Sequence, residues 1–227
     1  MKTQKVGYNI RIENRLPSFF QKDDFRKFLE NNLTSKDVFK QFLRNNPKIL
    51  HVTDSHGYSM LWYAAVMNQN IESVKLLLEE GASVDMPIEA GSTVFMSAIF
   101  NGLIEIADVL RNAGANINHQ NKNGHCALTM AVRSGFEKSI NYLIQLPGID
   151  LALTDKFGKY PIEYFNIETN NTHRNVLAHA LYKNKMYDPL IRYVRAVGLP
   201  YIEATDPTLY NILLEHQRRT KRQPSIL

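Results

Sequence analysis

Two series of glycines recur along the middle of the chain with nearly the same period. One series is Gly57, Gly91, Gly124 and Gly158, whose members follow one another at intervals of about 33 residues. The other begins the segment 81–85 (GASVD), which returns one period later as 114–118 (GANIN) and, in weaker form, once more at 148–151 (GIDL). Two independent markers that share one period indicate an internal structural repeat.

Each interval between the markers predicts two short helices. After each glycine of the first series comes an apolar segment with an alanine at the same place, namely Ala64, Ala98 and Ala131. A break follows at Asn68, Gly102 and Gly135, because Asn and Gly tolerate the left-handed backbone that ends a helix. The second helix of each unit carries one apolar stripe at i, i+3 and i+4 spacing. The second helices contain Val74, Leu77 and Leu78, then Ile106, Val109 and Leu110, then Ile140, Leu143 and Ile144.

The stretches between one helix pair and the next are polar and have the form of hairpin tips, as at 121–124 (NKNG) and 155–158 (DKFG). Helix, turn, helix and hairpin at this period resembles the ankyrin-repeat family, whose signature is T-P-L-H-x-A. No unit carries this signature whole. The four units have SMLWYA at 59–64, TVFMSA at 93–98, CALTMA at 126–131 and YPIEYF at 160–165. The resemblance covers residues 54–165.

The resemblance implies an all-α fold with short β-hairpin loops, in which stacked helix-turn-helix units form a solenoid with irregular helical caps. A unit of this kind cannot bury its apolar face alone, so the terminal units need polar outer faces. We expect an N-terminal tail at 1–18, a degenerate repeat or cap at 19–53, and about four repeats at 54–165, the last incomplete. Residues 166–227 are expected to form a C-terminal helical cap or a small helical extension with a basic tail.

Two local signals place helices in the caps. Thr34 and Asp37 have the spacing of a capping box, which predicts a helix with Phe39 and Leu43 on its apolar side, ended by Pro47. Asp206 followed by proline predicts the start of the last helix. Trp62 replaces the histidine of the family signature, and we expect it in the core.

We identify no catalytic or metal-binding motif in the sequence. The one cysteine, Cys126, lies beside His125, but adjacent residues at a helix start point to different sides. The seven histidines do not cluster at metal-ligand spacing, and the glycine-rich phosphate-binding motifs are absent. We therefore expect a protein that is not an enzyme and that binds no cofactor or metal. The alternative is an enzyme whose repeats hold the substrate and whose active site lies in the helices of 166–227.

The partner in ankyrin-repeat proteins usually contacts the hairpin tips and the exposed face of the first helices. The resemblance therefore implies a scaffold or adaptor that binds another protein on the concave side of the stack. The positions that we expect to contact the partner are His56, Tyr58, Val66, Met67, Glu89, Phe100, Asn101, Lys122, Asn123, His125, Arg133, Lys156 and Phe157. The sequence leaves open whether Val66, Met67 and Phe100 pack against neighbouring units instead.

Much of the net charge of +5 lies in the segment 216–222 (HQRRTKR). Contact of Arg218, Arg219, Lys221 and Arg222 with nucleic acid or anionic lipid is one interpretation of this cluster. We favour a solvated helix end whose cations lie near the negative pole of the helix dipole, because no base-reading motif accompanies the cluster.

The same composition bears on where the protein acts. The sequence contains no apolar run long enough to span a membrane, and no apolar signal core follows the first charged residues. We expect a cytoplasmic protein, or one that is secreted without a cleaved signal. The plentiful Asn and Lys and the degenerate units look like those of ankyrin proteins of intracellular bacteria, which implies an effector that acts on host proteins.

Overall fold

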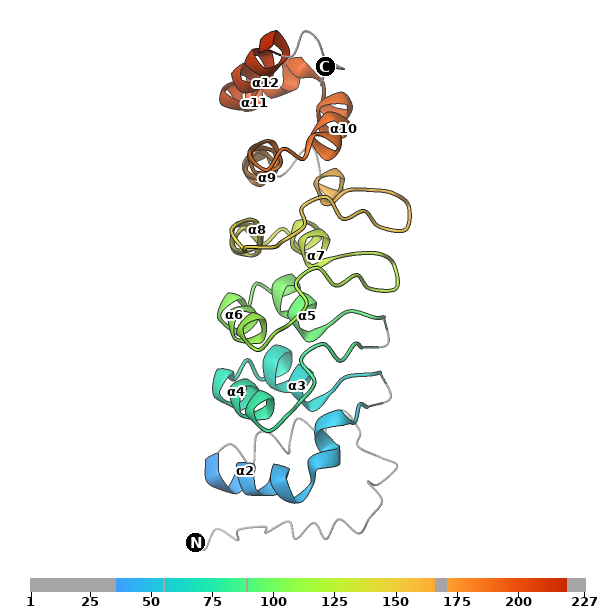
Figure 1. Ribbon diagram of the computed structural model, residues 1–227, viewed down its shortest axis with the longest axis vertical. Coiled ribbons are helices and arrows are strands. Elements are labelled where there is room, and N and C mark those ends of the chain that lie inside the picture. Colours follow the sequence, from blue (N-terminus) through green and yellow to red (C-terminus); the bar gives the residue numbers. More distant parts are fainter. Residues whose placement is uncertain (1–35, 55, 89, 166–170, 220–227) are drawn as a thin grey trace, which may run out of the picture.

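The chain forms an elongated stack of helix pairs in the computed structural model, which describes residues 36–54, 56–88, 90–165 and 171–219 (Figure 1). The helices lie in two columns. One column, the inner helices, contains α3 (Met60–Trp62) with the π-helical turn η2 (Tyr63–Met67), α5 (Val94–Phe100), α7 (Ala127–Ser134) and the 3-10 helix η3 (Pro161–Tyr164). The other column, the outer helices, contains α4 (Ile71–Glu79), α6 (Ile104–Asn112), α8 (Glu137–Ile144) and α9 (Asn171–Lys183).

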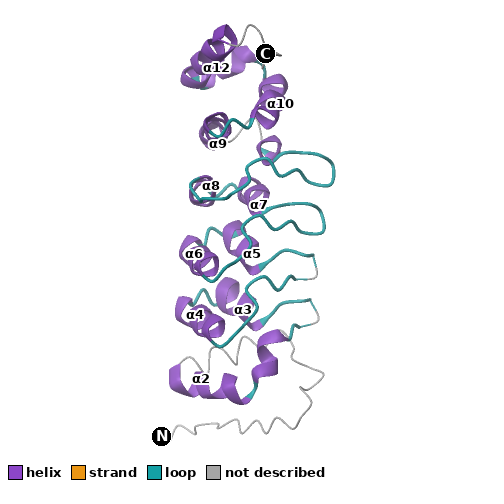
Figure 2. Ribbon diagram, in the orientation of Figure 1, coloured by secondary structure: helices purple, strands orange, loops and turns teal. Residues whose placement is uncertain are grey.

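The long loops between repeats all project from the same side of the stack, beyond the inner helices (Figure 1). Figure 2 shows no strand in these loops among the described residues, and an isolated antiparallel bridge joins Thr53 to Ser59. The loops therefore have the outline of hairpins without a sheet. The all-α stack of helix-turn-helix units predicted from the periodicity is confirmed.

One continuous apolar core runs through the stack. Ala64, Ala98 and Ala131 are fully buried, and each lies on an inner helix that packs against its neighbour. The small side chain at this position allows adjacent inner helices to approach closely. The outer helices add the predicted stripes, of which Leu77, Leu110 and Leu143 are fully buried. The repeats thus bury each other's apolar faces, which no single unit could do alone.

In the first repeat, the start of the inner helix and the start of the outer helix are separated by one residue more than in the second and third repeats. The residues that precede the inner helices are Ser59, Thr93 and Cys126. The interval from Ser59 to Thr93 is one residue longer than the interval from Thr93 to Cys126. The outer helices, in contrast, begin at equal intervals, at Ile71, Ile104 and Glu137. The π-helical turn η2 contains the extra residue, because the backbone N–H of Asn68 donates to the carbonyl of Tyr63, five residues back.

This extra residue moves the left-handed position at the end of the inner helix. Gln69, with φ of 50°, adopts the conformation that Gly102 and Gly135 adopt at 71° and 74°. The sequence-based assignment of Asn68 to this place is therefore wrong, since Asn68 has φ of −92°. A single added residue shifts the register by one, and glycine spacing alone does not show where the shift occurs.

We expect Gln69→Gly to raise the free energy of unfolding by about 0.5–1 kcal/mol, because glycine adopts a left-handed backbone without steric cost. Urea unfolding followed by circular dichroism measures the change. The reverse substitution, Gly102→Gln, should destabilise the protein by more than about 1 kcal/mol, since a Cβ there would also lie 3.2 Å from the ring of Phe136. A loss of stability in Gln69→Gly would contradict the assigned conformation.

The stack begins with α2 (Lys36–Asn45), followed by the 3-10 helix η1 (Pro47–His51), which contacts α2 and α3. Phe39 and Leu43 are buried, as the predicted apolar side requires, and Pro47 follows the end of α2. Thr34 of the predicted capping box lies outside the described residues. This segment therefore covers the apolar face of the first complete repeat.

The C-terminal helices continue the packing. Helix α9 packs on α8, and α10 (Tyr187–Val197) packs on α9 and η3. They are followed by α11 (Leu199–Thr205) and α12 (Pro207–Arg219). His179 Nε2 of α9 lies 2.9 Å from Asp206 Oδ2, and Asp206 Oδ1 accepts the backbone N–H of Leu209, which confirms the predicted helix start.

Candidate functional site

Each of three loops is closed by one side chain that accepts two backbone N–H groups. In the first loop Asp54 accepts from His56 and Tyr58, at 2.8 and 2.9 Å. Asn121 accepts from Asn123 and His125, and Asp155 accepts from Phe157 and Lys159. Local bonds of this kind hold a turn without help from a sheet. These bonds therefore fix the positions of the described residues at the three loop tips.

Neighbouring loops contact one another through their backbones. The N–H of Lys122 donates to the carbonyl of Ala90 at 3.2 Å, and the N–H of Lys156 donates to the carbonyl of Asn123 at 3.1 Å. Gly91 and Gly124 lie at these contacts, and both have positive φ. A Cβ at Gly124 would lie 2.6 Å from the backbone nitrogen of Lys156. The loops and the inner helices thus form one continuous surface, which we call the inner face.

Three exposed side chains recur at the C-terminal ends of the inner helices. Met67 and Phe100 are 39% and 41% exposed, and Arg133, at the same place in the third repeat, is also exposed. The residue before each of these three is apolar: Val66, Ile99 and Val132. Ile99 and Val132 are buried, and Val66 packs against the core. We therefore assign Val66 to packing between units, and Met67 and Phe100 to the surface.

An aromatic stack covers the first repeat. The ring centres of Tyr58 and Trp62 lie 3.9 Å apart, and the ring of His56 lies nearly parallel to that of Tyr58 with its centre 6.1 Å away. Trp62 Nε1 donates to the hydroxyl of Ser97 in the next repeat at 3.2 Å. Trp62 packs against the core but is only half-buried, so the expectation that it lies in the core is met only in part. Its equivalent positions in the next two repeats, Met96 and Thr129, are fully buried.

His125 does not lie on the surface as expected. It is 8% exposed and belongs to a chain of hydrogen bonds at the base of the third and fourth loops. Arg133 Nη1 is 3.0 Å from Nδ1 of His125, and the hydroxyl of Tyr164 is 3.3 Å from Nε2. Tyr164 donates its own proton to Asp155. The simplest assignment gives Nδ1 the acceptor role and Nε2 the proton, so that each donor in the chain has one acceptor.

The charges of this network follow from its surroundings. Burial lowers the pKa of His125, the positive charge of Arg133 lowers it further, and Asp155 opposes them only in part. Burial by itself raises the pKa of Asp155, but the hydrogen bonds from Tyr164 and from two backbone N–H groups outweigh it and lower the pKa overall. Burial and the bond to Asp155 raise the pKa of Tyr164 to about 12. At neutral pH the network therefore holds one carboxylate and a neutral imidazole.

The remaining expected contact residues are on the surface where the structure describes them. The exposed ones are His56, Asn101, Lys122, Asn123, Lys156 and Phe157, and Phe157 at the tip of the fourth loop is 84% exposed. Tyr58 is half-buried beneath His56. Glu89 lies outside the described residues. Of the basic tail, Arg218 is exposed on α12, and the side chains of Arg219, Lys221 and Arg222 lie outside the described part of the chain.

Sequence reasoning missed one exposed aromatic residue, Phe136, which precedes α8. In the first repeat the equivalent Asn70 caps the outer helix by accepting the N–H of Ser73 at 2.8 Å. Phe136 offers no such bond, and its ring lies against Gly102. An apolar residue at a helix-capping position was the signal in the sequence that could have identified Phe136 as exposed.

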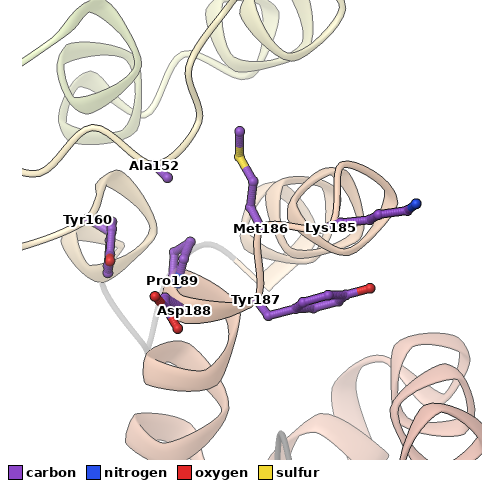
Figure 3. Close-up of a pocket in the computed structure, with 7 residues that line it drawn as sticks. All are labelled: Ala152, Tyr160, Lys185, Met186, Tyr187, Asp188 and Pro189. Atoms are coloured by element: carbon purple, nitrogen blue, oxygen red, sulfur yellow. The ribbon is translucent and has the colours of Figure 1, made fainter. Parts of the chain in front are cut away.

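A pocket of about 320 Å³ lies between the fourth repeat and the turn from α9 to α10 (Figure 3). It is lined by Ala152, Tyr160 and the segment 185–189. Its two charged groups, the Lys185 amine and the Asp188 carboxylate, are both exposed and point away from each other in Figure 3. An active site in the C-terminal helices would need polar groups that converge, and this pocket does not provide them.

In the described ranges, no three or more His, Cys, Asp or Glu side chains gather as a metal ion would require. Among the helices that the structure describes, none combines the length and apolar character needed to cross a membrane.

Comparison with known proteins agrees with the repeat architecture. A family model described as ankyrin repeats (3 copies) matches residues 29–121 and 89–155, which together make up more than half of the chain. The chain is 33% identical over 96 residues, or 42% of its length, to the inactive serine/threonine-protein kinase TEX14 of Bos taurus. In an alignment of 115 positions that covers 44% of the chain, it is 30% identical to the ankyrin repeat domain-containing protein SAT10 of Stachybotrys chartarum. The matched part is only 6% of either relative.

Proposed function

Because the chain belongs to the ankyrin-repeat family, whose repeats generally mediate protein–protein interaction, we propose that it binds a partner protein through its inner face. One observation carries this proposal: exposed side chains stand at equivalent places along one face of successive repeats, at Met67, Phe100 and Arg133. Phe157 extends the same surface at a loop tip. Met, Phe and Arg are the residue types enriched in interface cores.

The energetic argument favours a macromolecular partner. Burying an exposed Met or Phe side chain contributes about 1.5–3 kcal/mol, and several such contacts are needed to offset the entropy that association loses. The inner face spreads its apolar side chains over repeats one, two and four, so a partner must extend along the stack to bury them together. The residues that we propose contact the partner are His56, Tyr58, Met67, Phe100, Asn101, Lys122, Asn123, Arg133, Lys156 and Phe157.

An affinity capture from cytosolic extract tests the proposal, with the retained proteins identified by mass spectrometry. The variant Met67→Ser, Phe100→Ser, Phe157→Ser removes three exposed apolar side chains and should reduce capture of the partner at least about tenfold, because roughly 1.4 kcal/mol corresponds to tenfold in affinity. Its helical circular dichroism should match that of the unaltered protein, since none of the three side chains is buried.

A matched variant on the outer helices serves as the control. Lys75, Glu105 and Lys138 are exposed on α4, α6 and α8, and their replacement by serine should leave capture unchanged. Equal capture by the two variants would reject the inner face as the binding surface.

We further propose, from the Asn- and Lys-rich composition alone, that the partner is a host protein met after delivery from an intracellular bacterium. This finer proposal predicts a partner in animal-cell cytosol. A partner found in bacterial cytosol and not in animal-cell cytosol would contradict it.

A further inference from the structure

Four cations gather on the inner face of the third and fourth repeats. Lys122 and Lys156 lie at the tips of successive loops, which the backbone bond from Lys156 to Asn123 holds together. Arg133 and Lys159 lie behind the tips, with the Arg133 guanidinium carbon 5.9 Å and the Lys159 Nζ 5.7 Å from the ring centre of Tyr164. All four side chains are exposed. We call Lys122, Arg133, Lys156 and Lys159 the basic tract.

The basic tract has no carboxylate to neutralise it among the described residues. Other cations of the chain do have one: the side chains of Lys40, Arg44, Lys75, Arg111 and Arg192 each lie within 4 Å of a Glu or Asp oxygen. None of the four tract residues forms such a pair in the described part of the chain. Their positive charge is therefore available to a ligand.

Two acidic residues beside the tract, among those that the structure describes, are already engaged. Asp155 is buried and accepts the hydroxyl of Tyr164 and two backbone N–H groups. Glu163 accepts the backbone N–H of Tyr160 at 2.7 Å and lies 3.8 Å from Arg192. Neither carboxylate is free to turn toward Lys122 or Arg133. The exposed charges of the described residues on the third and fourth loops are therefore positive, and they attract most strongly a ligand that excludes water from these side chains.

The inner face changes character along the stack. At the places that Arg133 and Lys159 occupy in the later repeats, the first repeat has Met67 and Tyr58, and the second has Phe100 and Ser92. The described part of the inner face therefore passes from apolar and aromatic side chains to cations over four repeats. A partner that matches this surface must carry apolar side chains at one end and negative charge at the other.

We propose that the partner contacts the basic tract with an acidic polypeptide segment, while its apolar side chains contact Met67 and Phe100; this rests on the proposed function of the inner face. Phe157, 84% exposed between Lys156 and Lys159, gives the same segment an apolar contact among the cations. A segment in which carboxylates alternate with apolar side chains can contact both the cations of the basic tract and the ring of Phe157. A nucleic acid would place phosphates against Met67 and Phe100, where no cation of the described inner face meets them.

A binding titration tests the charge of the ligand directly. The probe is a fluorescein-labelled peptide rich in glutamate with one central phenylalanine, and its control has glutamine in place of each glutamate. Fluorescence polarisation should show that the glutamate peptide binds at least about tenfold more tightly than the glutamine peptide. Its affinity should fall severalfold as salt rises from about 0.05 to 0.3 M, because exposed charges are screened.

Charge reversal locates the binding to the tract. Lys122→Glu, Lys156→Glu, Lys159→Glu should weaken binding of the glutamate peptide at least about tenfold. The matched variant Lys48→Glu, Lys138→Glu, Lys183→Glu makes the same change in net charge at exposed lysines elsewhere and should stay within about twofold. Each substitution leaves the backbone groups that hold the loops in place, and circular dichroism checks the fold.

The outcomes separate this inference from the proposed function. Equal binding of the two peptides, or equal binding by the two charge-reversed variants, overturns the acidic segment. A single-stranded oligothymidylate that binds the tract more tightly than the glutamate peptide also overturns it. If capture of a cytosolic protein still depends on Met67, Phe100 and Phe157 in that case, the inner face remains the binding surface and only the acidic character of the partner is rejected.

Discussion

Gly124→Ala is expected to lower the free energy of unfolding by about 3 kcal/mol or more. The backbone at Gly124 has φ of 79°, which costs a residue with a Cβ about 1–2 kcal/mol. The added carbon would also lie 2.6 Å from the nitrogen of Lys156 and 2.8 Å from the Cα of Asp155. Both are backbone atoms of the next loop, so no flexible side chain can turn away. The loops must separate, and the bond between Lys156 and Asn123 is lost.

Gly158→Ala is the matched control for this substitution. Gly158 occupies the same place in the fourth loop with φ of 72°, but a Cβ there meets no atom within 4 Å. Its replacement by alanine should lower the free energy of unfolding by only about 1–2 kcal/mol, which is the cost of a left-handed backbone for a residue with a Cβ. Urea unfolding of both variants isolates the contribution of loop contact. Equal costs would show that the third and fourth loops do not touch.

Asp155→Ala is expected to destabilise the protein by about 3 kcal/mol, because it leaves the Tyr164 hydroxyl and two backbone N–H groups without their acceptor. Bonds to a charged acceptor contribute more than neutral ones, and this carboxylate is buried. Tyr164→Phe removes only one of the three bonds and should cost about 1–1.5 kcal/mol. If the two variants were equally stable, the backbone bonds to Asp155 would contribute nothing.

The same substitution should change how stability depends on pH. The pKa of Asp155 is lowered in the folded protein, so its contribution is fully present above the pKa of an unfolded aspartate, near 3.8. That contribution is lost as the pH falls below 3.8 and through the lowered pKa. The pKa of His125 is also lowered, so its contribution is lost as the pH falls below 6.5. Asp155→Ala should therefore flatten the profile below about pH 4 and keep the decline that begins near pH 6.5.

The repeat architecture could be predicted because its marker residues recur at a regular spacing in the sequence. The glycines that mark the loops, the alanines between inner helices and the apolar stripes of the outer helices all recur at one period, and each has the same physical task in every unit. Gly124 and Ala131 illustrate this, since each is explained by the close approach of the next repeat. Periodicity therefore identified the parts of the fold that repeat.

Features that occur once could not be found in the same way. The π-helical turn at Tyr63–Met67 places Val66 against the core and Gln69 in a left-handed conformation. The sequence alone does not show at which position the extra residue is accommodated. His125 is buried because Tyr164, which lies in the next repeat, covers it, and such a contact has no local signal. One signal was available: Asp54 with Tyr63 and Asp155 with Tyr164 form the same bonded pair at the same separation in the sequence.

The part of the candidate surface that repeats along the stack could be predicted from the period. Met67, Phe100 and Arg133 share a place in the repeat, so their common exposure follows from the architecture. The charge of the third and fourth loops was visible in the sequence as Lys122 and Lys156. That no carboxylate among the described residues pairs with these cations depends on the engagement of Asp155 and Glu163, which only the folded chain shows.

Hydroxyl-radical footprinting of the protein with its captured partner tests the central claim most directly, because exposed Met and Phe side chains are oxidised and buried ones are not. Binding on the inner face predicts that oxidation of Met67, Phe100 and Phe157 falls in the complex, while Leu78 and Tyr142 on the outer helices react as before. Unchanged oxidation of the three inner-face residues, with protection of Leu78 and Tyr142 instead, would contradict it.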